Sequence, residues 1–482
     1  MNGLPLIALL LAATALLWAL LLTLQTYEHR RYVRASLRNP PHGWHAPPAV
    51  LVCVPCKGLD LELADNLRCV LSQDYSKYQV RFIVDSVTDP ACATIRQLMS
   101  SSPVPCELLV AGSCTESGQK VHNLCCATAN LPAEVEVLAF FDSDAKPARD
   151  SLARLVHRVG RGKFKVATGY RWFVPQRPTA ANLALASVNA AVAGLLKGRG
   201  WNLIWGGSWA VTRDLFERAG VADAWRGTLS DDLVASRVLR LAGAQIVFEP
   251  GCMAASTIDA SWKEAASFLR RQFVIGRCYA PHAWWSTLPL MMLQPLVMFG
   301  GVGVAWVWAR QGNPLWFSPL LVSAILYALA VVRSHWRQVT WTARVKGPAT
   351  SLRAAALFDR WASPLSCLFA VATMLASGLG RTIVWRGIGY HMGPAGRITL
   401  LGRVPNTQQQ REMLAVHRAR LDRDQAAGNA ANIRKSAATG GANSARDRET
   451  VTDSTISGLR SITSVMAAID SMQPTLRQSN QG

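Results

Sequence analysis

The sequence lacks the motifs that identify several common protein classes. Its 11 cysteines are scattered, and the close pair Cys53 and Cys56 has no second pair at zinc-binding spacing. No compact nucleic-acid motif and no internal repeat are present. We therefore expect neither a structural zinc site nor a nucleic-acid partner, and we interpret the cysteines as reduced thiols in a cytosolic core.

Acidic residues are also scarce. The 482 residues include 51 Lys and Arg but 30 Asp and Glu, which gives a net charge of +21 and a pI near 10.0. Half of the residues are hydrophobic, and the mean hydropathy is +0.15. This value indicates soluble and membrane parts in one chain, with two or three structural units. The positive charge is then expected to face an anionic membrane surface and phosphorylated substrates.

A charge-free apolar run begins the chain. Leu4 to Leu24 has the length of a bilayer span, roughly 20 residues. No basic segment precedes it and no small-residue cleavage site stands out, so residues 1–25 are predicted to be an anchor and not a signal peptide. A basic cluster follows and places this side in the cytoplasm: Arg30, Arg31, Arg34 and Arg38.

Three further candidate spans lie within residues 286–380: Leu288–Trp308, Leu315–Val332 and Ala362–Leu379. Four spans in total would put both chain ends outside, yet arginines follow the last segment. Either that segment is re-entrant or interfacial, or the charge rule is overridden, and the sequence leaves both open. The polar tail, residues 405–482, is predicted to be disordered.

The region between, residues 45–280, alternates short apolar runs with helical ones, which predicts an α/β fold with a mostly parallel sheet. The apolar run Thr179–Leu196 interrupts this region and is expected to lie on the membrane or in the core rather than to span. The predicted strands are Val50–Pro55, Val80–Asp85, Glu107–Ala111, Val135–Phe141 and Val166–Trp172. Such sheets bind ligands at the carboxyl ends of their strands.

Acidic residues fall at those ends. Asp85 ends one strand, and Asp142 and Asp144 follow another in the sequence Phe-Phe-Asp-Ser-Asp. Two carboxylates in this spacing suit Mg²⁺ or Mn²⁺ bridging a diphosphate. Turn chemistry before Lys146 explains the same pair equally well.

Other candidates stand near predicted helix starts. Lys120 and Asn123 lie in Gly-Gln-Lys-Val-His-Asn, where a lysine and a helix start together suit a phosphate; the alternative is a solvated lysine. Gly206 and Gly207 would let the backbone approach a sugar closely.

The adjacent carboxylates Asp231 and Asp232 open another helical run. They are consistent with a simple helix cap and equally with a general base that takes a proton from an acceptor hydroxyl.

Taken in order, these motifs resemble the ceramide glucosyltransferase family, within the family 2 type of inverting glycosyltransferases. The matching stretches run from the first apolar segment to about Tyr390 and include VRFIVDSVTDPA, GQKVHN, FFDSDAKP, WGGSWAVTRDLFERAG and SDDLVASRVLRLAGA. The resemblance implies a GT-A fold, a UDP-sugar donor, a divalent cation and a membrane lipid acceptor.

The resemblance also implies residue roles. Asp85 would contact the uridine or ribose, and Lys120 would contact the pyrophosphate. Asp142 and Asp144 would hold metal and diphosphate. The catalytic base would be Asp232, with Asp231 beside it.

One motif departs from the family pattern. The family has (Q/R)xxRW near the membrane; here Arg271 fills the first place, but Val274 and Ile275 stand where Arg and Trp are expected, and Arg277 follows. Arg271 and Arg277 are candidate substitutes for holding the acceptor and the donor diphosphate, and Arg271 is assigned to the nucleotide-sugar site. The alternative is that they are membrane-surface arginines.

The sequence therefore predicts an integral membrane enzyme with a cytosolic catalytic domain, in a bacterial inner membrane or a Golgi/ER-type membrane. It would transfer a hexose, glucose by resemblance, from a UDP-sugar to a lipid hydroxyl such as that of ceramide. The alternatives are a processive polysaccharide synthase and an inactive transferase-like scaffold. Loss of the (Q/R)xxRW motif argues against the first, and the retained aspartates argue against the second.

Overall fold

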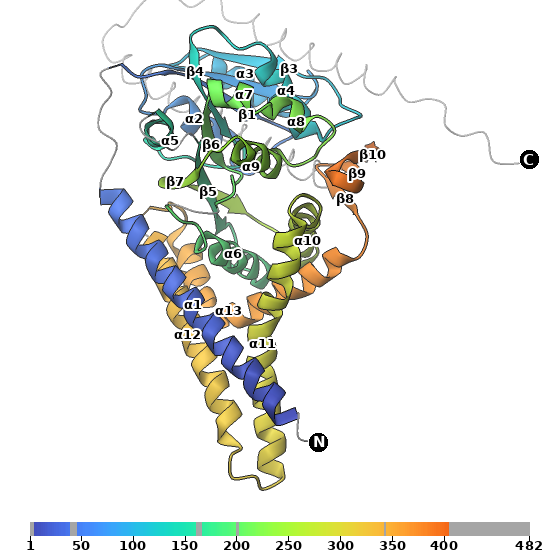
Figure 1. The fold of residues 1–482 in the computed structure, drawn as a ribbon. Helices are drawn as coiled ribbons and strands as arrows, with labels where there is room; N and C mark the ends of the chain where they lie inside the picture. The colour runs from blue at the N-terminus through green and yellow to red at the C-terminus, as the bar shows by residue number, and fades with distance from the viewer. Residues whose placement is uncertain (1–3, 39–45, 161–165, 199–201, 342–343, 404–482) are drawn as a thin grey trace, which may run out of the picture. The chain divides into compact units, whose positions relative to one another are not determined.

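The computed structural model describes residues 4–38, 46–160, 166–198, 202–341 and 344–403 (Figure 1). The predicted polar tail, residues 405–482, lies outside the described residues. The central part is an α/β domain with a seven-stranded sheet in the order β3-β2-β1-β4-β6-β5-β7. Its strands are β1 (Ala49–Pro55), β2 (Tyr78–Val84), β3 (Cys106–Val110), β4 (Val135–Phe141), β5 (Val166–Pro175), β6 (Ser208–Thr212) and β7 (Ile246–Ile258).

Four neighbouring strands, β1 to β4, run parallel, and β6 is antiparallel to both β4 and β5. The predicted mostly parallel sheet is thus confirmed, and each of the five predicted strands is present. Two strands were not predicted. β7 contains Pro250 and Gly251, which usually interrupt a strand, and β6 is a five-residue segment.

Helices connect the strands. They are α2 (Leu63–Leu71), α3 (Ala91–Met99), α4 (Gln119–Ala129), α5 (Ser151–Gly160), α6 (Ala180–Ala193), α7 (Arg213–Arg218), α8 (Val221–Trp225), α9 (Asp231–Leu241) and α10 (Trp262–Tyr279). The apolar run near residue 180 is α6, which contacts β5 and the later helix α13 (Ala349–Gly378) and is shorter than a membrane span.

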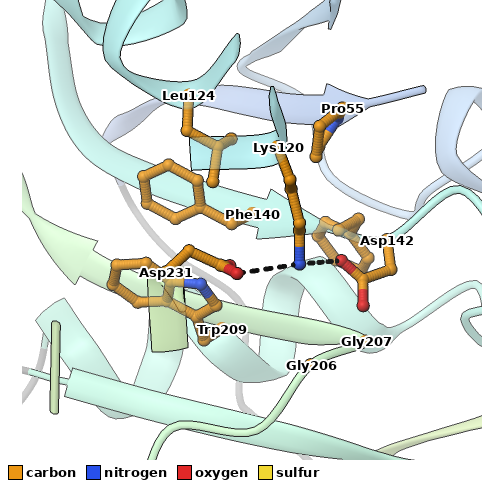
Figure 2. A pocket seen from close by; sticks show the side chains of 10 residues that line it. Pro55, Lys120, Leu124, Phe140, Asp142, Gly206, Gly207, Trp209 and Asp231 are labelled. Atoms are coloured by element: carbon orange, nitrogen blue, oxygen red, sulfur yellow. Dashed lines mark ion pairs between the residues drawn. The ribbon is translucent and has the colours of Figure 1, made fainter. Parts of the chain in front are cut away.

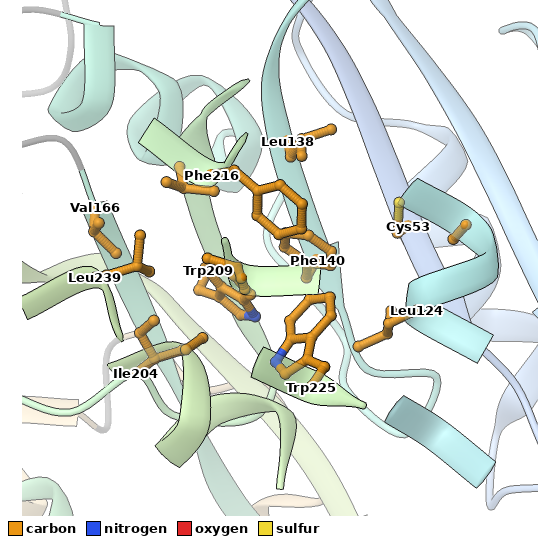
Figure 3. Packing of buried hydrophobic residues seen from close by; sticks show 14 of the residues in the cluster. Cys53, Leu124, Leu138, Phe140, Val166, Ile204, Trp209, Phe216, Trp225 and Leu239 are labelled. Carbon is orange, nitrogen blue, oxygen red and sulfur yellow. The ribbon is translucent and has the colours of Figure 1, made fainter. Parts of the chain in front are cut away.

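Aromatic side chains of β4, β6 and α8 pack together in the core beside the first residue of α9. Phe140 of β4 stacks on Trp209 of β6 with ring centroids 4.2 Å apart, and Trp225 of α8 meets Phe140 edge-on at 5.8 Å (Figure 3). Trp225 is fully buried and donates its indole N–H to the carbonyl of Asp231 at 2.8 Å. The core therefore holds the first residue of α9 in place.

Within the described residues, four helices are long and apolar enough to cross a membrane: α1 (Leu4–Arg38), α11 (Pro281–Arg310), α12 (Phe317–Trp341) and α13. α1 continues past the predicted anchor end at residue 25 as one helix to Arg38. The helices α1, α11 and α12 contact one another, and large apolar side chains along them are exposed, as expected for surfaces that face lipid.

Both ends of α13 contact the α/β domain or its last helix, α10. Near its start, Ser351 donates a hydrogen bond to the carbonyl of Gln176 at 3.5 Å. At its end, the Arg270 guanidinium of α10 donates to the carbonyl of Leu379 at 2.7 Å, and Arg277 donates to the carbonyls of Gly378 and Gly380.

A buried ion pair anchors the middle of α13. Arg337 of α12 donates to Asp359 through Nε at 2.8 Å, and Ser187 of α6 donates to the same carboxylate at 2.6 Å. Asp359 is fully buried, so its charge depends on these partners.

After α13 the chain forms a small antiparallel sheet that we call the C-terminal sheet: β8 (Thr382–Trp385), β9 (Ile388–Met392) and β10 (Ile398–Arg403), with a short 3₁₀ turn, Pro394–Gly396, between the last two. It packs on the α/β domain. The backbone N–H of Gln119 donates to the Tyr390 hydroxyl at 3.2 Å, and the N–H of Ile398 donates to the carbonyl of Gly227 at 3.0 Å.

Candidate functional site

The carboxyl ends of β1, β2 and β4 meet at one edge of the sheet, as expected for parallel neighbours. Lys57 follows β1, and its ammonium group lies 2.5 Å from Asp85 Oδ2, directly after β2. Asp142 and Asp144 follow β4. The sheet thus brings together basic and acidic side chains that are far apart in sequence.

Lys120, in the first turn of α4, is the central cation of this edge. Its ammonium group lies 2.8 Å from Asp142 Oδ1 and 3.1 Å from Asp231 Oδ1 (Figure 2). These groups line a hollow of about 10 Å³ together with Gly206 and Gly207. One lysine therefore connects the carboxyl end of β4 with the first turns of α4 and α9.

A second cation, Arg171 of β5, bridges the Asp-Ser-Asp motif. Its guanidinium pairs with Asp144 Oδ2 and lies 4.0 Å from Asp142 Oδ2. The glycines beside it leave room for these groups. A Cβ on Gly207 would stand 2.4 Å from Arg171 Cγ, and one on Gly206 would stand 2.9 Å from Asp142 Oδ2. Both glycines are thus explained by close approach to the site's own side chains.

Burial and neighbouring charges shift the pKa values of Asp142, Asp231 and Lys120 by different amounts. Burial opposes ionisation of Asp142, but Lys120 and Arg171 outweigh it and lower the pKa of Asp142 to about 2. Burial raises the pKa of Asp231 to about 6; Lys120 opposes this rise, and the charges of Asp232 and Asp142 add to it. Burial would lower the pKa of Lys120, but Asp142 and Asp231 raise it overall. Asp231 is therefore the member of the cluster that titrates nearest to neutral pH.

The two carboxylates that open α9 have different surroundings. Asp231 is buried and faces Lys120. Asp232 Oδ1 accepts hydrogen bonds from the Ser230 hydroxyl at 2.5 Å and from the N–H of Leu233 at 2.8 Å. Its other oxygen, Oδ2, accepts no hydrogen bond from the described residues. The first carboxylate is engaged by a cation, and the second keeps one oxygen for another partner.

Asp85 sits in a separate part of the site. Besides Lys57, its Oδ2 receives Arg403 of β10 at 3.3 Å, while its buried Oδ1 has no hydrogen-bond partner among the described residues. Arg403 also donates to Gln119 Oε1 at 2.8 Å, and Gln119 donates to Asn123 Oδ1 at 2.9 Å. Asn123 therefore supports Gln119 from behind instead of lining the hollow beside Lys120.

The residues present suit a divalent cation. Among the described residues, no three His, Cys, Asp or Glu side chains gather to hold a metal. Asp144 Oδ1 is nevertheless buried without a hydrogen-bond partner in this part of the chain, next to Asp142. Two carboxylates at this position fit Mg²⁺ or Mn²⁺, which take their remaining ligands from phosphate oxygens and water.

The arginines of α10 separate into two kinds. Arg277 binds the carbonyls at the end of α13, and its guanidinium carbon lies 6.0 Å from the ring centroid of Trp284. Arg271 makes no ion pair or hydrogen bond with the described residues. Instead, its guanidinium carbon lies over the rings of Phe268 and Trp385, at 5.1 and 5.5 Å from their centroids. Of the two substitutes, Arg271 is the one with neither an ion pair nor a hydrogen bond to the described part of the chain.

Several site residues were not predicted. Lys57 comes directly after a predicted strand, so the strand-end rule that selected Asp85 was sufficient to find it. Arg171 lies inside a predicted strand, where the face toward which its side chain points decides its role. Arg386 and Arg403 follow α13, and no local pattern links them to the sheet edge.

The CxxC pair belongs to the core and not to this chemistry. Cys53 and Cys56 are buried and unbridged, and burial raises the pKa of the Cys53 thiol to about 12. Burial therefore keeps the Cys53 thiol protonated and weakly reactive.

Two comparisons with known proteins bear on the chain. A sequence model described as Glycosyl transferase family 21 matches residues 9–398. A solved mannosyltransferase from Pyrobaculum calidifontis, in complex with GDP-Man and Mn²⁺, is 18% identical over 76% of this chain and 99% of its own, with a TM-score of 0.40. The family match confirms the resemblance found in the sequence motifs.

The raised pKa of Asp231 predicts a pH-dependent stability. Because the folded pKa of Asp231, about 6, exceeds its ordinary value of 3.8, the folded state holds this proton more tightly. The resulting contribution is present below pH 4 and is lost as pH rises through 6, up to about 3 kcal/mol. Thermal unfolding of the full chain in detergent should therefore show a steeper loss of stability between pH 4 and pH 6 for the unsubstituted protein than for the Asp231→Asn variant.

The control for this measurement is Asp223→Asn, which removes a carboxyl with an exposed side chain. It should keep the slope of the unsubstituted protein. Equal slopes for the unsubstituted protein and Asp231→Asn would show that Asp231 does not carry the raised pKa.

Proposed function

We propose, on the premise that this chain belongs to glycosyl transferase family 21, that it transfers a hexose from a UDP-sugar to the hydroxyl of a membrane lipid. Family membership rests on the match over residues 9–398. The proposed hexose is glucose, and the proposed acceptor is ceramide or another lipid alcohol. The product would be a glycolipid bearing one sugar.

The observation that carries the proposal is the position of Lys120 between Asp142 and Asp231. A partly buried lysine between carboxylates at the carboxyl edge of a parallel sheet suits a diphosphate, because phosphate oxygens can replace carboxylates as its partners. Lys120 pairs with Asp142 and Asp231, which line the hollow with it. The donor diphosphate would take over Lys120 and Arg171 and leave Asp142 and Asp144 to a cation.

The same residues suit an inverting single displacement. Asp85, with its unpaired Oδ1, would accept a hydrogen bond from the uracil or ribose. Asp232 Oδ2 would take the proton from the lipid hydroxyl as its oxygen attacks the anomeric carbon. Asp231 would keep Lys120 oriented, and Lys120 and Arg171 would stabilise charge on the departing diphosphate. A bound Mg²⁺ or Mn²⁺ would supply further stabilisation of that charge.

A membrane position for the site follows from α13. Its 30 residues correspond to about 45 Å of helix, more than a bilayer core needs. Yet its first turn bonds to Gln176, and the residues at its end bond to Arg270 and Arg277. We propose that α13 lies along the membrane interface and that three helices, α1, α11 and α12, cross. The arginines after residue 379 would then lie on the cytosolic side with the α/β domain, as the positive-inside rule expects.

Transfer assays with purified full-length protein test the function. In vesicles containing ceramide or another lipid alcohol, labelled UDP-glucose should give a lipid with one sugar in the inverted configuration. Chelation should abolish transfer, and Mn²⁺ should restore it. A long polymer as product would support the processive synthase instead. UDP binding without metal dependence would contradict the roles given to Asp142 and Asp144, and absence of any transfer would support the inactive scaffold.

Substitution at α9 tests the assignment of the base. Asp232→Asn keeps the shape of the side chain and removes its basicity, so donor binding should persist while transfer falls by at least about a hundredfold. Equilibrium binding of UDP and single-turnover transfer separate the two effects. Asp223→Asn provides the matched control, with normal transfer. Near-normal turnover of Asp232→Asn would move the role to Asp231 or another residue.

Reporter fusions test the membrane arrangement. Green fluorescent protein joined after Arg403 should fluoresce in bacterial cells, and alkaline phosphatase at that position should be inactive, because both would remain in the cytoplasm. Fusions after Gln311, in the turn between α11 and α12, should give the opposite pattern. Active phosphatase after Arg403 would place α13 across the membrane.

A further inference from the structure

In α10, two apolar residues take the places of the Arg and Trp of the (Q/R)xxRW motif, and they have a structural role. Val274 and Ile275 stand where Arg and Trp are expected, and they are 0% and 8% exposed. They pack in one cluster with Ile383 and Ile388 of the C-terminal sheet. These two positions therefore dock the C-terminal sheet and do not contact a ligand themselves.

The turn that joins β8 to β9 carries a Trp and an Arg side by side. Trp385 pairs with Ile388 across a two-residue loop, and the loop residues Arg386 and Gly387 have φ values of 50° and 74°. Positive φ at both loop positions is the geometry of the tightest hairpin turns, in which Asn and Gly are the preferred residues. An arginine is strained in this conformation, and such strain often accompanies a functional side chain.

Arg386 reaches the edge of the site. Its guanidinium donates to the carbonyl of Lys57 at 2.7 Å and pairs with Asp60 Oδ1 at 2.6 Å. The other oxygen of Asp60 accepts a hydrogen bond from the Ser143 hydroxyl at 2.6 Å. Ser143 separates the two carboxylates of the Asp-Ser-Asp motif, so Arg386 is two hydrogen-bonded contacts away from the proposed metal and diphosphate position.

Trp385 positions Arg271, which fills the first place of the (Q/R)xxRW motif. Its ring lies beneath the Arg271 guanidinium, which has no carboxylate partner among the described residues. Arg271 lines a cleft of about 210 Å³ between α10 and β8, together with Arg270 and Ile383. Burial, together with the nearby charges of Arg386 and Arg171, lowers the pKa of Arg271 to about 10. Such uncompensated positive charge favours an anionic ligand.

We propose that the C-terminal sheet completes the donor site by returning the missing Arg and Trp from a distant part of the chain: Arg386 binds the donor diphosphate, and Trp385 is a positioning residue that holds Arg271 toward it. This proposal rests on the proposed function, because it assumes a nucleoside diphosphate sugar as donor. Arg386 pairs with Asp60 in the structure, and a donor diphosphate would offer it a second anionic partner.

Binding of UDP and of uridine to the full-length protein, measured by calorimetry in detergent with Mn²⁺, tests the role of Arg386. Arg386→Asn suits the strained turn but removes the cation that faces the buried Asp60 carboxylate, so its thermal unfolding is measured first to show that the variant folds. UDP binding should weaken ten- to a hundredfold, as expected for loss of a charged hydrogen bond, while uridine binding stays unchanged. Arg386→Lys should recover part of the UDP affinity because it keeps the charge.

Arg381→Asn is the matched control. Arg381 is an exposed arginine just before β8 and makes no side-chain ion pair with the described residues, so its loss changes the net charge equally. Its UDP affinity should stay within twofold of normal. If Arg386→Asn binds UDP as tightly as Arg381→Asn does, the proposal for Arg386 is wrong while the proposed function stands. If the unsubstituted protein does not bind UDP at all, the proposed function itself fails.

A double-substitution cycle tests the role of Trp385. Trp385→Ala should weaken UDP binding in the unsubstituted background and have little further effect in Arg271→Ala, because Trp385 acts through Arg271. Trp385→Phe keeps an aromatic face and should restore most of the affinity. Additive losses in the cycle would overturn the positioning role.

Discussion

The contact on which the site depends is the ammonium group of Lys120 between two buried carboxylates. A buried charge is stable only if a partner offsets it, and here each charge depends on the others. Asp142 stays ionised because Lys120 and Arg171 are close, and Asp231 holds its proton more tightly because it is buried next to other carboxylates. The ends of β4, α4 and α9 are thereby fixed to one another before any ligand arrives.

Hydrophobic packing sets the positions of these charged groups. Phe140 and Trp209 bring β4 and β6 together, and Trp225 reaches from the same core to the carbonyl of Asp231. The carboxylates at the sheet edge are therefore supported by large, fully buried rings. Substitutions in that aromatic core would displace the site without changing a single charged residue.

The sequence was informative where chemistry and local pattern coincide. Continuous apolar runs predicted the parallel strands, and the rule that ligands bind at their carboxyl ends selected Asp85, Asp142 and Asp144. Lys120 was found because it stands at a helix start. The roles assigned to these residues remain predictions, while their convergence at one sheet edge is visible in the structure.

What the sequence did not predict depends on contacts between distant segments. Arg386 and Arg403 reach the sheet edge only because α13 returns the chain to the α/β domain, and no local periodicity reports that return. In the sequence alone, Val274 and Ile275 indicate only that the Arg and Trp of the (Q/R)xxRW motif are missing. Their meaning becomes visible only with β8 and β9 packed against them.

The bonds from Arg270 and Arg277 to the end of α13 have a mechanical consequence. They join α10 to α13 directly before the C-terminal sheet, so little slack remains between α13 and the hairpin that carries Arg386. A tilt or rise of α13 would therefore move that hairpin. With α13 at the membrane interface, as proposed, the thickness and packing of the surrounding bilayer would set how tightly the hairpin presses on the sheet edge.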